Sequence, residues 1–164
     1  MNALTDEIER AISSGLYYLA IMSSLALPDI CAALESPDGE TRGSRYKQWC
    51  EQWFVRLYPR LTSDDLYYMR CGLVHQGRSG HPKSQYSRVI FTIPIASGNY
   101  FHNNVANDAL NLDAPTFCRD MIGATTRWYI AKQADPNVVA NLPRLMRLHP
   151  NGLAPYMVGM PVIA

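Results

Sequence analysis

The chain places an arginine and a histidine five residues apart, in the stretch Arg70-Cys71-Gly72-Leu73-Val74-His75. An arginine guanidinium stays protonated in proteins, so Arg70 can only bind and neutralise negative charge. A histidine imidazole titrates near neutral pH, so His75 can accept or donate a proton. Two such groups side by side can hold a phosphate and move a proton next to it. We therefore predict that Arg70 and His75 form the functional site.

An arginine four to six residues before a histidine is a short pattern, and about one chance match is expected in a chain of this composition. A second copy does occur, at Arg144-Leu145-Met146-Arg147-Leu148-His149. Pro143 and Pro150 flank it, which predicts an irregular surface segment, so we favour the first copy. The alternative is purely structural: Arg70 pairs with Asp65 or Glu51, and His75 donates a hydrogen bond near a helix end.

A helix from about Asp64 to Gln76 should carry the pair. Thr62 or Ser63 can cap its start, and Thr62-x-x-Asp65 has the spacing of a capping box. Gly77 is placed to end it. The apolar stripe that would face the core is Leu66, Met69, Leu73 and Val74.

The expected helix raises a geometric problem for the pair. Residues five apart lie about 140° apart around an ideal helix. We therefore expect Arg70 and His75 to share a cleft only if the helix loosens near its end, or if two subunits surround one cavity.

The rest of the pattern predicts a mostly α fold with a small β insert. Helical periodicity indicates helices at about 5–25, 28–34, 44–58 and 114–132, with a further segment from Asp135-Pro136. Residues 86–95 are rich in β-branched side chains, and 105–112 form a plausible second strand, so we predict a β-hairpin around 86–112 with a loop at Ser97-Gly98-Asn99. We expect one domain over 1–150. The tail 151–164 should be an extended arm that docks Tyr156, Met157, Val158 and Ile163.

Composition excludes a disordered chain and a generally basic one. The 164 residues are 48% hydrophobic and 18% charged, and the net charge is +1. The charges are nevertheless segregated. Residues 1–40 hold seven acids against Arg10 alone, whereas residues 41–90 hold nine bases against three acids. The basic middle segment predicts a phosphate-facing surface. The alternative is that these bases pair with the acidic N-terminal part.

The cysteines and the N-terminus indicate a cytoplasmic protein. None of Cys31, Cys50, Cys71 and Cys118 has Cys-x-x-Cys spacing, so we expect reduced core residues. The N-terminus lacks bases ahead of an apolar run, and the run from Leu16 to Leu27 is interrupted by serines and too short to span a bilayer. We expect no membrane association, no cofactor and no metal. A zinc site of Cys71, His75 and His81 is the alternative.

Residues 66–77 resemble the signature helix of HEPN-like proteins. More narrowly, they are similar to a group of small bacterial proteins with an Arg-Cys-x-Leu-x-His-x-Gly core. The segments Tyr46-x-x-Trp49-Cys50 and Phe117-Cys118-x-Asp120 also resemble that group, so the similarity extends over about residues 5–130. The family pattern commonly has Asn or Asp directly after the arginine, where this chain has Cys71.

The resemblance implies a bundle of four to six helices, homodimeric, that cleaves RNA without a metal. Arg70 would hold the scissile phosphate, and His75 would transfer a proton as the ribose 2′-hydroxyl attacks, leaving a 2′,3′-cyclic phosphate. Apart from the resemblance, we predict that Arg42, Arg45, Gln76, Arg78 and His81 bind substrate. Such a ribonuclease would serve in a toxin or phage-defence system with a cognate antitoxin or defence partner. The alternative is a non-catalytic module that binds nucleic acid or dimerises through its aromatic helix.

Overall fold

The computed structural model describes residues 1–95, 98 and 100–164. With 53% of the chain helical, the fold is mostly α, as predicted. The helices are α1 (Asn2–Ser13), α2 (Tyr17–Leu34), α3 (Gly43–Trp53), η1 (Val55–Leu57), α4 (Ser63–Gln76), α5 (Ala114–Lys132), α6 (Pro136–Asn141) and η2 (Leu142–Arg144). The strands are β1 (Arg88–Thr92), β2 (Asn104–Ala106), β3 (Ala109–Asp113), β4 (Leu148–His149), β5 (Gly152–Leu153), β6 (Met157–Val158) and β7 (Val162–Ile163).

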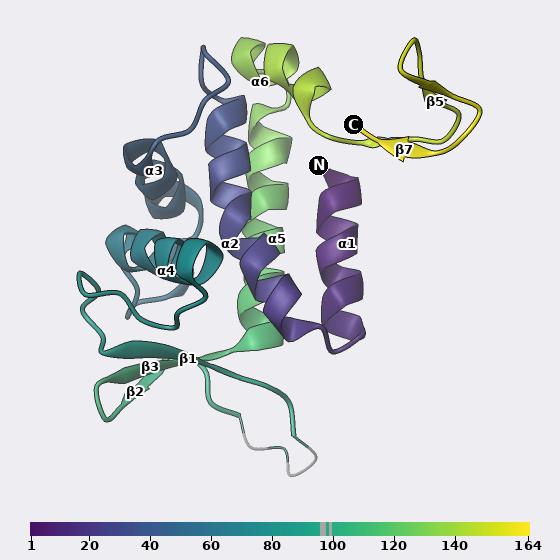
Figure 1. The fold of residues 1–164 in the computed structure, drawn as a ribbon. Helices are drawn as coiled ribbons and strands as arrows, with labels where there is room; N and C mark the ends of the chain where they lie inside the picture. The colour runs from purple at the N-terminus through teal and green to yellow at the C-terminus, as the bar shows by residue number, and fades with distance from the viewer. Residues whose placement is uncertain (96–97, 99) are drawn as a thin grey trace.

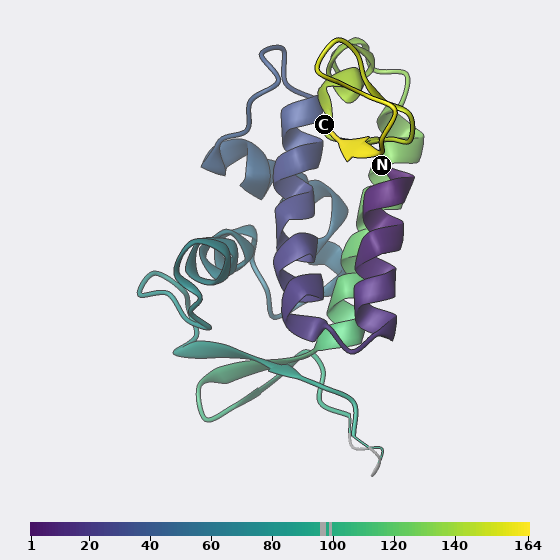
Figure 2. The same cartoon turned by 45° about the vertical axis from the view of Figure 1, so that its right-hand side comes forward.

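The helices form two groups above a small sheet. Helices α1, α2 and α5 stand side by side, while α3 and α4 pack on the flank of α2 (Figures 1 and 2). The core between them is filled by fully buried large side chains, among them Trp128, Tyr46, Tyr58, Phe54 and Phe117. Of the aromatic side chains of α3, Tyr46 and Trp49 face this core and Trp53 is half-buried.

The first two helices divide earlier than the sequence predicted. Gly15, with φ of +72°, lies in the connection between α1 and α2, so the expected helix over 5–25 is two helices. Glycine adopts positive φ without steric cost, which makes it a natural point for such a break. Pro28, which we expected to start a helix, lies inside α2.

Helix α2 is the one described helix that is long and apolar enough to cross a membrane by length and composition, and half of it is buried inside the protein. It contacts α1, α3, α4 and α5. A helix with neighbours on most sides buries most of its faces, which accounts for its apolar composition.

The β insert is a three-stranded sheet in the order β1-β3-β2, and the predicted hairpin between residues 86–95 and 105–112 is wrong. Strand β1 pairs with β3 in parallel, and the hairpin is instead β2–β3. Asn107 and Asp108 form its turn with φ of +48° and +60°, positive values that a two-residue hairpin turn requires. Ser97 and Asn99 of the expected loop lie outside the described residues.

Helix α4 begins and ends as its sequence predicts. The Thr62 hydroxyl accepts a hydrogen bond from Asp65 N at 3.1 Å, and the Asp65 carboxylate accepts one from Thr62 N at 3.1 Å, which completes the capping box. Gly77 follows the helix with φ of +62°. A Cβ on Gly72 would lie 3.1 Å from the Gly80 carbonyl oxygen, so the chain leaving α4 folds back directly against it.

Asp65 also binds the loop at 78–87 that follows α4. Its Oδ1 accepts hydrogen bonds from Ser84 Oγ and Gln85 N, both at 3.1 Å, although Asp65 is only 3% exposed. Burial alone would raise the pKa of Asp65, but the hydrogen bonds from Thr62 and Gln85 outweigh it and lower the pKa below its usual value. One carboxylate therefore joins the start of α4 to the loop at 78–87.

We expect Asp65→Asn to lower the free energy of unfolding by about 1–3 kcal/mol at pH 7, because the amide turns a donor toward Thr62 and Gln85. Since the folded protein depresses this pKa, the carboxylate stabilises it fully above about pH 4 and loses that effect as the pH falls through the depressed value. Urea unfolding of the wild type and of Asp65→Asn, at pH 7 and in acid, should show that the difference between their free energies of unfolding is smaller in acid. Asp64, the exposed neighbour, provides the control: Asp64→Asn should lower the free energy of unfolding by about 1 kcal/mol or less. Equal losses in the two variants would contradict this role.

The C-terminal segment turns away from the helices and pairs with itself (Figure 1). Strand β4 is antiparallel to β7, and β5 to β6. The predicted docking of the tail is wrong: Tyr156, Met157, Val158 and Ile163 are exposed, Tyr156 by 83%. Residue 150, the predicted end of the helical domain, lies between β4 and its partner strand β7.

Candidate functional site

Arg70 and His75 meet within a single α4 helix. Arg70 Nη1 lies 2.6 Å from His75 Nε2. The expectation that they would need a loosened helix or a second subunit is therefore wrong. It considered only the directions in which the two Cβ atoms leave the helix, whereas the long arginine side chain can reach along and around it. Because the guanidinium is always a donor, Nε2 must accept, which assigns the proton of a neutral His75 ring to Nδ1.

Asp29 of α2 anchors the other side of the guanidinium. Arg70 Nε donates to Asp29 Oδ2 at 2.7 Å, and the two side chains are only 21% and 16% exposed. The sequence offered Asp65 and Glu51 as partners of Arg70, and the partner is neither of them. Asp65 is occupied by Thr62 and the 78–87 loop. With Nε fixed by α2, the Nη edge of Arg70 is held toward His75.

The electrostatics of the pair follow from partial burial. Burial raises the pKa of the Asp29 carboxyl, and the nearby Arg70 charge opposes that rise. For Arg70, burial alone would lower the pKa, but Asp29 and Cys71 raise it overall. Arg70 is therefore a permanent cation held at a half-buried position.

Cys71 lies in this site and not in the core. Its Sγ is 4.0 Å from Arg70 Nη1, and Cys71 is half-buried whereas the other three cysteines are buried. The prediction of four core cysteines is thus wrong at this position. A hydrogen bond to Cys71 raises the pKa of Tyr67, one turn earlier on α4.

His81 lies beside the same helix, where its ring stacks on Tyr68. The ring centroids are 4.7 Å apart and the planes differ by 9°. His81 Nδ1 accepts a hydrogen bond from Lys83 N at 3.1 Å, which fixes the ring orientation. His81 also lines a hollow of about 490 Å³ together with the 80–87 loop and Asp108. Tyr68 and His75 are seven residues apart on α4, so they lie on the same helix face.

The remaining predicted substrate residues are not drawn into this cluster. Arg42 Nη2 and Arg45 Nη1 bind the two oxygens of Asp38, at 3.1 and 3.0 Å. These pairs, like that of Arg70 with Asp29, join bases of the middle segment to acids of residues 1–40, as the alternative interpretation of the charge pattern expected. Gln76 and Arg78 are exposed at the end of α4.

Two competing sites receive no geometric support. Among the described residues, no group of three His, Cys, Asp or Glu side chains is arranged to hold a metal ion, so Cys71, His75 and His81 do not converge. His149 of the second Arg-His copy lies in the two-residue strand β4, where its backbone pairs with Val162.

Sequence reasoning missed two members of the cluster, Asp29 and Tyr68. Asp29 had a usable signal, because it is the only charged residue in the apolar segment 17–34, and such a residue is rarely buried without a partner. Nothing in the sequence marked Tyr68 above the other tyrosines nearby.

Comparison of the chain with models of known protein families, with curated proteins and with solved structures gave no match. The HEPN-like resemblance therefore remains a prediction that rests on residues 66–77.

Proposed function

We propose that the protein is a metal-independent endoribonuclease of HEPN type. The observation that carries the proposal is the contact between Arg70 Nη1 and His75 Nε2, made by an arginine that Asp29 holds in place. A fixed cation beside a neutral imidazole supplies both groups that cleavage through the 2′-hydroxyl needs: a phosphate binder and a proton acceptor.

Substrate binding would itself free His75 to act as the general base. Unbound, His75 Nε2 accepts from Arg70; a phosphate oxygen that takes the Nη1 donor leaves the Nε2 lone pair free. Nε2 then accepts the proton of the 2′-hydroxyl as that oxygen attacks phosphorus. The bond to the 5′-oxygen breaks, the leaving oxygen takes a proton from solvent, and a 2′,3′-cyclic phosphate remains.

The Tyr68–His81 stack would hold a base next to the scissile phosphate. A ring kept parallel to Tyr68 and bordering a hollow offers a face on which a nucleobase can stack, an interaction worth about 1–3 kcal/mol per base. We therefore place single-stranded RNA along the line from His81 to His75.

His81→Ala should weaken binding of a short single-stranded RNA by roughly tenfold, because alanine has no ring on which a nucleobase can stack. Fluorescence anisotropy with a labelled oligonucleotide measures the change. His149→Ala removes another half-buried histidine outside the cluster and should bind as wild type does. Equal affinities for His81→Ala and wild type would remove His81 from the RNA path.

The partners follow from the same proposal. We infer a cytoplasmic homodimer that acts on RNA under the control of an antitoxin or another defence partner. Tyr46 and Trp49 of α3 are buried, which argues against the aromatic helix as the dimer surface. Sedimentation equilibrium should give twice 18.5 kDa, and a mass of 18.5 kDa would contradict the dimer.

One observation favours a second candidate, the non-catalytic module. The Arg70–Asp29 pair is mostly buried and joins α4 to α2, as a purely structural ion pair would. The Arg70 variants discussed below separate this candidate from the ribonuclease.

A further inference from the structure

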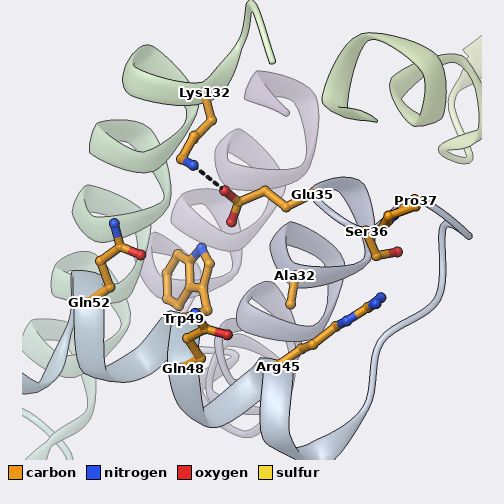
Figure 3. A pocket seen from close by; sticks show the side chains of 9 residues that line it. All are labelled: Ala32, Glu35, Ser36, Pro37, Arg45, Gln48, Trp49, Gln52 and Lys132. Carbon is orange, nitrogen blue, oxygen red and sulfur yellow. Dashed lines mark ion pairs between the residues drawn. The ribbon is translucent and has the colours of Figure 1, made fainter. Parts of the chain in front are cut away.

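A second pocket lies on the opposite side of α3 from α4. It is an open pocket lined by the C-terminal end of α2, one face of α3 and the last turn of α5, and its volume is about 220 Å³ (Figure 3). None of its lining residues belongs to α4, so it is separate from the Arg70–His75 site. Its polar lining comprises Glu35, Ser36, Arg45, Gln48, Gln52 and Lys132 around the Trp49 indole.

Trp49 brings an unsatisfied donor to this pocket. The residue is only 2% exposed, and its indole N–H has no acceptor among the described residues. In Figure 3 the indole nitrogen points to the side of the pocket where Lys132 and Glu35 form their ion pair. Buried N–H groups are nearly always hydrogen-bonded, because leaving one unpaired costs free energy. An acceptor delivered by a ligand would remove that cost.

Two cations lie around the indole and offer partners to an anionic ligand. Lys132 Nζ lies 2.7 Å from Glu35 Oε1, and Arg45 binds Asp38, which does not line the pocket. Each cation of the lining is thus already paired with one carboxylate, so an anionic ligand has to take the place of one of these partners. Both cations are partly shielded from water, with side chains 33% and 29% exposed, so they attract an anion more strongly than free surface charges do.

We propose that this pocket binds a small organic anion through a carboxylate or phosphate oxygen. The oxygen displaces Glu35 from Lys132, pairs with that ammonium group and accepts the Trp49 N–H. Displacement of Glu35 is needed because its carboxylate already pairs with the Lys132 ammonium group and because the indole nitrogen is covered. The volume lies below the range of about 300–1,000 Å³ that drug-sized ligands occupy, which limits the ligand to a few heavy atoms.

Isothermal titration calorimetry with sodium phosphate and with sodium succinate, at an ionic strength held constant with sodium chloride, tests the proposal. Saturable binding of phosphate alone would identify a phosphorylated ligand, and binding of succinate alone a carboxylate. Binding of both would define a general site for small oxyanions. Absence of saturable binding of either probe at millimolar concentrations would overturn the proposal.

Matched variants locate the binding. Trp49→Phe and Lys132→Gln should each lower the affinity for the probe by about tenfold, the loss expected for one hydrogen bond or ion pair. Trp53→Phe is the control, because its indole N–H is also buried without a partner among the described residues but does not line this pocket. Lys132 is at the end of α5 and partly exposed, so its variant should fold even if Trp49→Phe does not. Unchanged affinity in folded Lys132→Gln would also overturn the proposal.

Discussion

Replacing His75 with alanine should lower RNA cleavage by roughly 10²–10⁴-fold, the usual contribution of one general acid or base. The fold should persist, because the His75 side chain is exposed on the last turn of α4 and contributes little packing. Cleavage of a labelled RNA with the enzyme in excess measures the effect, and circular dichroism checks the fold.

The control for His75 is His149→Ala, which changes the histidine of the second Arg-His copy and should cleave as wild type does. Because the proposed chemistry uses no metal, EDTA should leave the wild-type rate unchanged. Full activity in His75→Ala would remove the catalytic role, and inhibition by EDTA would favour the metal-dependent alternative.

Arg70→Ala should abolish both RNA binding at the scissile phosphate and cleavage. Arg70→Lys should recover only part of either, because a single ammonium group cannot reach Asp29, His75 and a phosphate at once as the planar guanidinium can. Binding by anisotropy and cleavage rates, measured on the same two variants, give the comparison. A lysine variant as active as wild type would show that only the positive charge matters.

The variant Asp29→Asn tests whether the position of the Arg70 guanidinium matters in addition to its charge. The amide can still accept from Arg70 Nε, but it loses the ion pair that fixes the guanidinium. We expect cleavage to fall more than RNA affinity does, with Asp29→Glu restoring part of the rate. If instead the Arg70 and Asp29 variants unfold and the wild type does not cut RNA, the cluster is structural and the non-catalytic module is the better account.

Helix α4 was predictable because its signals are local. The Thr62–Asp65 capping box and Gly77 lie within a few residues of the ends they define, so the sequence alone determined the boundaries. The contact between Arg70 and His75 was not predictable from helix geometry, since it depends on the reach and rotamer of one long side chain.

The partners of α4 depend on contacts far along the chain. Asp29 precedes Arg70 by 41 residues, and the sequence offered nearer acids that the fold uses elsewhere. The pairing of the strands shows the same limit. The Asn107-Asp108 turn was a local sign of the β2–β3 hairpin, but the parallel pairing of β1 with β3 joins segments about twenty residues apart. The Val89 amide of β1 also donates to Ser79 O in the loop after α4, at 2.7 Å.

The most direct test of the central claim is the chemistry of the RNA ends that the wild-type protein produces in EDTA. An account in which Arg70 holds the phosphate and His75 accepts the 2′-hydroxyl proton predicts 2′,3′-cyclic phosphate ends from the wild type and none from His75→Ala. Product ends with a 3′-hydroxyl, or the same cyclic ends at the same rate from His75→Ala, would contradict it.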